Sequence, residues 1–147
     1  MTAYKTIVVG TDGSATASLA VDRAGKVAAD CDARLVIVCA YERTERPDPD
    51  AQAALGSDWM VVGSGPAEDV ANAAAARVRA AGAAKVETMT AKGSPVEVLD
   101  RAVSNVSADL LVVGNVGLNT LTGRILGSVP QNLARRSGVD VLIVHTS

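Results

Sequence analysis

The chain has 147 residues, which suits a single domain over residues 1–147, and its hydrophobic content of 48% is too high for a disordered chain. Its 14 basic and 16 acidic side chains give a formal net charge of −2, which argues against a general nucleic-acid binder, because phosphate backbones require a surplus of Lys and Arg. No apolar run reaches the ~20 residues that are needed to span a membrane.

The first part of the chain alternates strand-like and helical segments. Tyr4 to Gly10 contains a continuous β-branched run, which predicts a strand that is covered on both faces. Ser14 to Asp30 predicts a helix with Ser14 as its N-cap. The apolar residues of this helix recur at roughly helical spacing and are expected to face the core: Leu19, Val21, Ala24, Val27 and Ala28. Arg34 to Tyr41 predicts a second strand.

The middle of the chain starts with a segment of different character. Glu42 to Gly63 contains two prolines and four acidic residues up to Asp50, which predicts a long surface excursion with a short helix around Ala51–Leu55. The Ala-rich segment Pro66 to Ala81 predicts a helix that Gly82 terminates. Lys85 to Lys92 alternates polar and apolar residues, which is typical of an edge strand.

The last part of the chain predicts one more helix and two strands around a glycine-rich loop. Ser94 is placed to cap the helix, Pro95 suits its first position, and Glu97 completes a capping box. The buried stripe of this helix is expected to be Val96, Leu99 and Val103. The remaining predicted elements are a strand over Asp109 to Gly114, a helix from near Ser128 to Gly138, and a strand over Val139 to His145.

Five strands that alternate with four helices predict an α/β fold. Strand–helix–strand units favour a parallel sheet with right-handed crossovers and helices on both faces. Open parallel sheets bind ligands beyond the carboxyl ends of their strands, where the strand order reverses. We therefore expect a ligand site near the loops that follow the first and fourth strands.

Two loops have the composition of such a site. The first is Gly10-Thr11-Asp12-Gly13-Ser14, and the second runs from Gly114-Asn115-Val116-Gly117 to Gly127-Ser128. Glycines allow backbone to pass close to a ligand, and Gly127-Ser128 lies at a predicted helix start, where free N–H groups attract anions. The second loop therefore predicts a phosphate cradle that contains no lysine.

Together these residues resemble the universal stress protein family, in its nucleotide-binding branch. The motif of that branch, G-x2-G-x9-G-[ST], is met by Gly114, Gly117, Gly127 and Ser128. The resemblance extends to Val-Val-Gly-Thr-Asp-Gly-Ser near the start, to Asp-Leu-Leu-Val-Val-Gly, and to the closing Val-Leu-Ile-Val. It covers nearly the whole chain and is weakest across Glu42 to Gly63. It implies a Rossmann-like open sheet with the strand order 3-2-1-4-5.

The resemblance also implies roles for individual residues. Asp12, next to Gly10 and Thr11, would accept hydrogen bonds from the ribose or lie near a metal held by the phosphates, although a turn or helix cap is the alternative. The residues expected to face the adenine or the nucleoside are Val38, Cys39, Ala40, Val113 and Asn115. The residues expected to contact phosphate through backbone N–H groups are Gly127, Ser128 and Val129. Arg124 is either a phosphate contact or a solvated loop charge.

The function that this resemblance implies is binding of ATP or cyclic AMP, with Mg²⁺ accompanying ATP, by a cytoplasmic stress or signalling responder. Phosphoryl transfer requires cations around the γ-phosphate, so we expect at most slow ATP hydrolysis. One alternative is an interaction module that forms homodimers through Val139 to Val144, because an exposed strand edge invites pairing. Another is a flavodoxin-like electron carrier, which the aromatic content of 2% disfavours.

Overall fold

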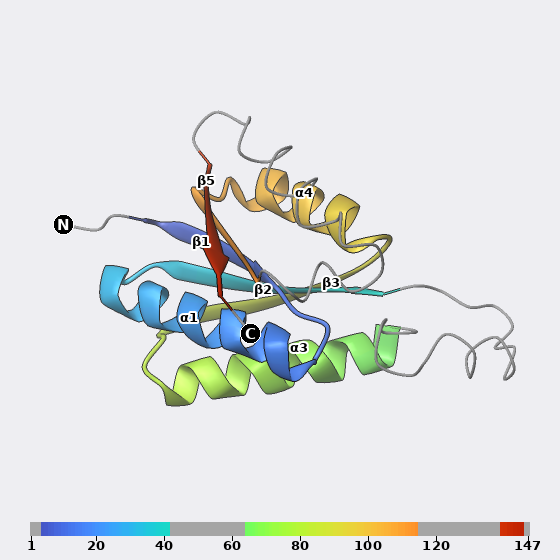
Figure 1. Cartoon of the computed structure of the whole chain (residues 1–147), viewed down its shortest axis with the longest axis horizontal. Helices are drawn as coiled ribbons and strands as arrows, with labels where there is room; N and C mark the ends of the chain where they lie inside the picture. Colours follow the sequence, from blue (N-terminus) through green and yellow to red (C-terminus); the bar gives the residue numbers. More distant parts are fainter. Residues whose placement is uncertain (1–3, 42–63, 115–138, 146–147) are drawn as a thin grey trace, which may run out of the picture.

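The computed structural model describes residues 4–41, 64–114 and 139–145 of the chain. These residues form a parallel sheet of β1 (Thr6–Gly10), β2 (Arg34–Tyr41), β3 (Lys85–Lys92), β4 (Leu110–Gly114) and β5 (Asp140–Val144). The strand order is β3-β2-β1-β4-β5, and every pair of neighbouring strands is parallel (Figure 1). The predicted α/β sheet and its strand order are therefore confirmed.

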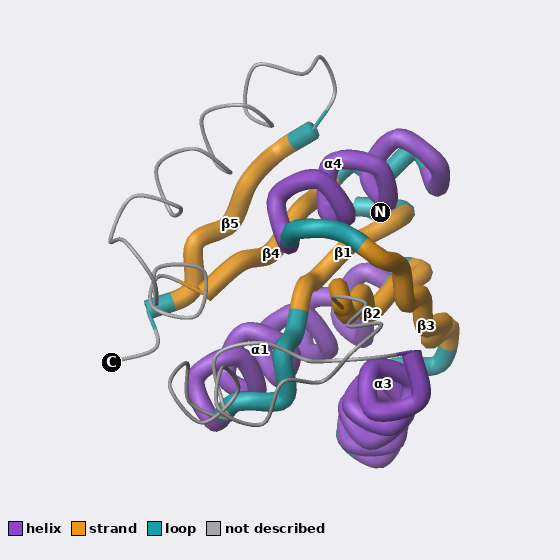
Figure 2. The backbone as a smooth tube through the Cα atoms, turned by 90° about the vertical axis from the view of Figure 1, so that its right-hand side faces the viewer, coloured by secondary structure: helices purple, strands orange, loops and turns teal. Residues whose placement is uncertain are grey.

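Helices cover both faces of the sheet. Helices α1 (Ala15–Cys31) and α3 (Ser64–Ala80) lie on one face, and α4 (Pro95–Val106) lies on the other (Figure 2). The first two crossovers step from β1 to β3, and the third returns past β1 to β4, so right-handed connections place α4 on the opposite face. The predicted helices at Ala51–Leu55 and Ser128 to Gly138 lie outside the described residues.

The strands of the sheet divide the core into two clusters. On β1, Ile7 and Val9 point toward α1 and α3, whereas Val8 points toward α4, and all three side chains are fully buried. Since successive side chains of a strand alternate between the faces, the continuous apolar run of β1 supplies both clusters. No helix within the described ranges is long and apolar enough to cross a membrane.

The two serine N-caps that the sequence predicted, Ser14 and Ser94, are confirmed. The Ser14 hydroxyl accepts a hydrogen bond from the Ala17 amide at 3.1 Å, and the Ser94 hydroxyl accepts one from the Glu97 amide at 3.3 Å. Each serine has extended backbone angles, as N-cap residues do, and Pro95 occupies the first helical position. These caps fix where the chain turns from the carboxyl edge of the sheet into a helix.

The predicted core face of α1 is wrong at one position. The Leu19 side chain is 49% exposed, whereas Ala17, Val21, Ala24 and Ala28 are buried. These four residues follow one another at three- or four-residue steps and so lie on one helix face, from which Leu19 is turned away. In α4, Leu99 and Val103 are buried as predicted, whereas Val96 is only half-buried. The prediction omitted two further buried residues of this helix, Val98 and Ala102.

The edge position predicted for β3 is confirmed, and neighbouring side chains cover part of that edge. Of the strands in the described ranges, β3 hydrogen-bonds only to β2. The Arg79 guanidinium, at the end of α3, donates to the carbonyl oxygen of Val86 at 3.0 Å. Arg34 of β2 makes a two-pronged ion pair with Glu87. One of the outward carbonyl groups of β3 is therefore occupied by a cation.

Candidate functional site

The candidate site lies at the carboxyl edge of the sheet, around the end of β1. Strand β1 pairs with β2 on one side and with β4 on the other, so the strand order reverses there. Gly10 is opposite Val38 in the register, and Val9 is opposite Val112, the residue before Val113. The structure thus brings together the ends of the three strands that carry the predicted site residues.

The turn from β1 into α1 is held by hydrogen bonds from the amides of Thr11, Gly13 and Ser14. The Thr11 amide donates to the Val38 carbonyl oxygen at 2.9 Å, which fastens the turn to β2. The Gly13 amide donates to the Thr11 hydroxyl at 3.1 Å, and the Ser14 amide donates to Asp12 Oδ1 at 2.9 Å. Gly13 has a φ of +84°, which other residues adopt only with strain. The turn is therefore fixed before any ligand arrives.

Two polar groups of this turn keep hydrogen-bonding capacity. Thr11 is 9% exposed, and its hydroxyl accepts from Gly13, but the hydroxyl proton has no acceptor within the described part of the chain. Asp12 is half-buried, and its Oδ2 has no donor among the same residues. Considering the described residues alone, the Thr11 hydroxyl proton and Asp12 Oδ2 keep the hydrogen-bonding capacity that suits a ligand with hydroxyl or other polar groups.

Cys39 lies close to the Asp12 carboxylate and is fully buried. Burial and, to a smaller extent, the negative charge of Asp12 raise the pKa of the Cys39 thiol to about 11. The thiol packs with Ala67 and Ala71 of α3 and is neutral at physiological pH. Cys39 therefore acts as a small apolar residue beneath the turn.

The side chains of the three β2 residues that are expected to face the adenine do not share a face of the sheet. Val38 and Ala40 point to the α4 side, whereas Cys39 points to the α3 side. Val38 is 2% exposed, and its carbonyl oxygen already accepts from Thr11. A flat ring on the α4 side would contact Val38 and Ala40 but not the Cys39 side chain.

The end of β4 completes the α4 side of the site. Val113 belongs to the same buried cluster as Val38, and Gly114 ends the strand opposite Val144. Leu99 of α4 packs over Gly10, because a Cβ built on that glycine would lie 3.1 Å from Leu99 Cδ2. The sequence placed Leu99 in the core but gave no sign that it touches the site, since that contact arises only when α4 packs on β1.

The rest of the predicted site lies outside the described residues. The strand register and the contacts of the turn bring part of the predicted site together at the carboxyl edge of the sheet. These residues are Gly10, Thr11, Asp12, Val113 and Gly114. The predicted residues that the structure does not describe are Asn115, Gly117, Arg124, Gly127, Ser128 and Val129. Within residues 4–41, 64–114 and 139–145, no group of three His, Cys, Asp or Glu residues is arranged to hold a metal ion.

Comparison with known proteins gives consistent matches along the chain. Residues 3–145 match the model of the universal stress protein family. A universal stress protein of Mycobacterium tuberculosis is 47% identical over 147 residues, the full length of both chains. A putative universal stress protein of Staphylococcus aureus is 35% identical over an alignment of 150 residues, which covers 99% of this chain and 87% of that protein.

Solved structures agree with these matches. The crystal structure of a universal stress protein in complex with cAMP is 47% identical, with a TM-score of 0.73, and the match covers 99% of this chain and 100% of that one. The structure of the universal stress protein from Archaeoglobus fulgidus in complex with dAMP has a TM-score of 0.64, and the match covers 95% of this chain and 97% of that one. Its identity to this chain is 19%, so this match shows a shared fold. This chain belongs to the universal stress protein family.

Proposed function

We propose that this protein binds an adenine nucleotide, ATP or cyclic AMP, at the carboxyl edge of the sheet and acts as a stress or signalling responder. The observation that carries the proposal is the fixed turn at the end of β1, in which Thr11 and Asp12 keep polar groups for a ligand. The cAMP complex of a relative that is 47% identical supports the choice of nucleotide.

In this proposal Asp12 binds the ribose. Its Oδ1 is held by the Ser14 amide at 2.9 Å, so Oδ2 is oriented to accept from a sugar hydroxyl. ATP and cyclic AMP both carry a 2′-hydroxyl group, whereas only ATP keeps a free 3′-hydroxyl group. The carboxylate oxygen also suits Mg²⁺, which would arrive with ATP, because that ion prefers oxygen ligands.

The apolar residues on the α4 side would contact the base. Val38 and Ala40 end β2 there, and Val113 ends β4. Val38 and Val113 are each 2% exposed, whereas Ala40 is half-buried and offers the base more surface. The phosphates are assigned to Gly114 and to the glycine motif beyond it, which the sequence predicts as their cradle.

The proposal includes little catalysis. Phosphoryl transfer requires cations that stabilise charge on the γ-phosphate. In the described part of the site the charged residue is Asp12, which is an anion. We expect ATP hydrolysis to be slow at most, so that bound nucleotide acts as a signal and not as a substrate under rapid turnover.

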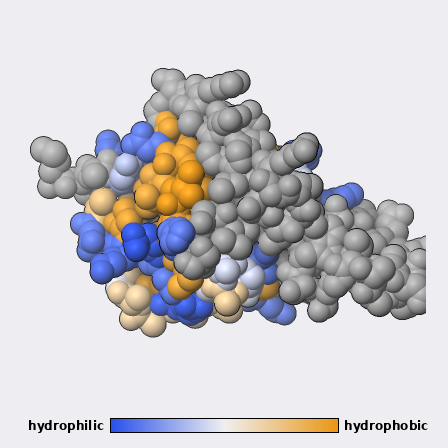
Figure 3. Space-filling view, in the orientation of Figure 1, coloured by the Kyte–Doolittle hydropathy of each residue, from blue (hydrophilic) through white to orange (hydrophobic). Residues whose placement is uncertain are grey.

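We also propose that two copies pair through β5. Among the residues that the structure describes, strand β5 hydrogen-bonds only to β4, and its Ile143 side chain is 47% exposed. Hydrophobic residues gather over β5 on the face seen in Figure 3. The opposite edge, β3, has its Val86 carbonyl covered by Arg79. Analytical ultracentrifugation should show a dimer that Ile143→Lys weakens and that Leu19→Lys, an equally exposed position on a helix, leaves intact.

Calorimetry with a nucleotide panel tests the binding function. We expect saturable binding of ATP or cyclic AMP, weaker binding of the matching guanine nucleotide, and weaker binding of the 2′-deoxy analogue. Asp12→Ala should reduce affinity by at least about tenfold, as the loss of a charge-assisted hydrogen bond predicts. Asp30→Ala, an exposed carboxylate on α1, is the matched control and should bind as the parent does. Absence of binding to every adenine nucleotide would refute the proposal.

A further inference from the structure

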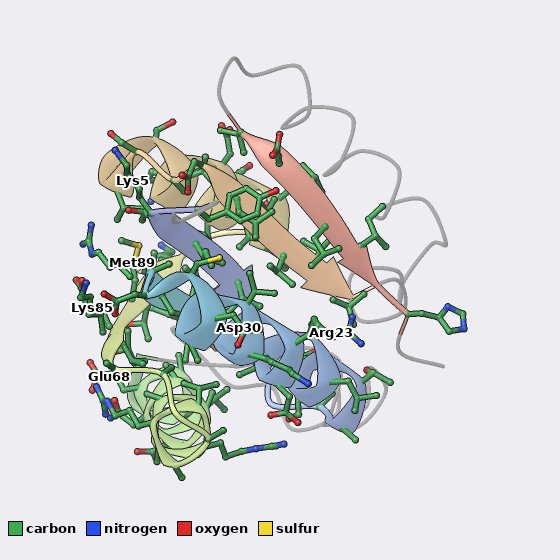
Figure 4. All side chains as sticks on the ribbon, turned by 90° about the vertical axis from the view of Figure 1, so that its left-hand side faces the viewer. Lys5, Arg23, Asp30, Glu68, Lys85 and Met89 are labelled. Carbon is green, nitrogen blue, oxygen red and sulfur yellow. The ribbon has the colours of Figure 1, made fainter. Side chains whose placement is uncertain are left out.

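A closed set of contacts ties three strands together at the amino edge of the sheet, opposite the candidate site. Asp109, just before β4, accepts from the Lys5 amide at 2.9 Å and from the Thr6 amide at 3.0 Å through its two carboxylate oxygens. The Asp109 amide in turn donates to the Thr6 carbonyl oxygen at 3.0 Å. Asp109 therefore fixes the start of β1 against the start of β4. The label of Lys5 in Figure 4 shows where this amino edge of the sheet lies.

The same set reaches the outer strand β5. The Asp140 amide donates to the Asp109 carbonyl oxygen at 3.0 Å, and the Tyr4 hydroxyl donates to Asp140 Oδ2 at 2.9 Å. Strand β1 does not pair with β5, because β4 lies between them. The Tyr4 side chain therefore spans β4 and joins the first residue of β5 to the segment that precedes β1.

The amino end of β5 is only partly buried among the described residues, where Val139 and Val141 pack against the α4-side cluster. The strand has five residues and, within the described part of the chain, pairs with β4 on one side. Asp140 is exposed, Val141 and Leu142 are half-buried, and Val144, at the other end, is the buried residue of the strand. The Tyr4 ring is half-buried and packs against the core cluster on the α1 side of the sheet, against which Leu142 also packs. Its hydroxyl and its ring thus both act at the less buried end of β5.

We propose that the Tyr4–Asp140 hydrogen bond is a latch that holds the amino end of β5 in the sheet and so controls the edge through which two copies pair. The second half of this inference rests on the proposed homodimer. With the latch closed, β5 presents a straight, ordered edge; with the latch open, its first residues detach more often and the edge loses pairing residues. The segment before β1 thereby sets the strength of an interface formed by the last strand.

Hydrogen exchange by mass spectrometry tests the latch on the intact chain. Tyr4→Phe and Asp140→Ala should each speed exchange in peptides covering residues 139–145 by about fivefold, the effect of one hydrogen bond. Asp140→Asn keeps an acceptor oxygen and should stay close to the parent. Tyr41→Phe removes a hydroxyl that has no hydrogen bond among the described residues and is the matched control.

Sedimentation of the same variants tests the link to pairing. The dimer dissociation constant should rise by a similar factor in Tyr4→Phe and Asp140→Ala, and the double variant should add little to either single change. Exchange at 139–145 that is equal in Tyr4→Phe and Tyr41→Phe would overturn the latch. A parent protein that sediments as a monomer would overturn the homodimer and the control of pairing, while the exchange data would still decide whether the latch exists.

Discussion

The Thr11 amide lies 2.9 Å from the Val38 carbonyl oxygen and donates a hydrogen bond to it. This contact extends the pairing of β1 and β2 by one residue beyond Gly10, the last residue of β1. It fixes the turn that carries Thr11 and Asp12, so that a ligand need not order the backbone on binding. The proposed nucleotide affinity should therefore depend on the side chains of this turn.

Thr11→Val should weaken nucleotide binding by about tenfold, because it removes a nearly buried hydroxyl and leaves the Gly13 amide without its acceptor. Thr11→Ser keeps the hydroxyl and should retain most of the affinity. Calorimetry with the preferred nucleotide measures both. Equal affinities of the valine and serine variants would show that the hydroxyl has no part in binding.

The contact between α1 and α3 limits residue size at Gly25. A Cβ built on Gly25 would lie 2.7 Å from Val78 Cγ1 and 2.9 Å from Val78 Cβ, so one helix must move. Gly25→Ala should lower the free energy of unfolding by about 1–3 kcal/mol despite the better helix propensity of alanine. Gly65→Ala, in the first turn of α3, meets nothing within 4 Å and should be neutral or stabilising. Urea unfolding measures the free energy of unfolding of both variants. Equal values for Gly25→Ala and Gly65→Ala would mean that α1 and α3 are loosely packed at Gly25.

The two cysteines should differ in reactivity. Cys39 is fully buried with a pKa of about 11, whereas Cys31 is partly exposed. Thiolates are the reactive form, so a thiol reagent near pH ~8 should modify Cys31 quickly and Cys39 only after unfolding. The Cys31→Ser variant should then react negligibly in the native state and fully in denaturant. Fast labelling of that native variant would contradict the packing beneath the Asp12 turn.

Tyr4 should make stability depend on pH in the alkaline range. Its hydrogen bond to Asp140, followed by burial and the charges of Asp140 and Asp109, raises the Tyr4 pKa above its ordinary value of 10.0. The folded chain then holds the phenolic proton more tightly than the unfolded chain does. This stabilisation is complete below the unfolded pKa and is lost as the pH rises through the folded pKa.

Tyr4→Phe removes this contribution. Between about pH 8 and about pH 11, the free energy of unfolding should fall less steeply in Tyr4→Phe than in the parent, since the variant has no phenol to ionise at that position. Urea unfolding at the two pH values measures both slopes. Parallel slopes would mean that the Tyr4 proton is held equally in the folded and unfolded chains.

The sequence predicted the sheet well because four strands are compact apolar runs bounded by turn residues, and β3 shows the alternation of polar and apolar residues that is typical of an edge strand. Helix faces were harder to predict. Leu19 is more hydrophobic than the alanines around it, yet Ala17, Val21, Ala24 and Ala28 fill the narrow space against the sheet, and Leu19 is exposed. The roughly helical spacing of the apolar residues therefore misplaced Leu19, because the prediction left out Ala17, which starts the buried face.

Prediction of the candidate site was limited by contacts between distant segments. Thr11 and Asp12 follow β1 directly, so their position at the carboxyl edge could be read from the chain. The alternation that puts Cys39 on the α3 side and Val38 on the α4 side follows from strand geometry, but the prediction treated these residues as one wall. The packing of Leu99 over Gly10 depends on how α4 crosses the sheet, which no local pattern records.

Nuclear magnetic resonance on isotope-labelled protein tests the location of nucleotide binding most directly. Titration with ATP or cyclic AMP should shift the amide signals of Gly10, Thr11, Asp12, Ala40 and Gly114, at the carboxyl edge of the sheet. The signals of Asp109 and Asp140, at the amino edge, should stay in place. Shifts that are absent at the carboxyl edge, or that concentrate at the amino edge, would contradict the proposed site.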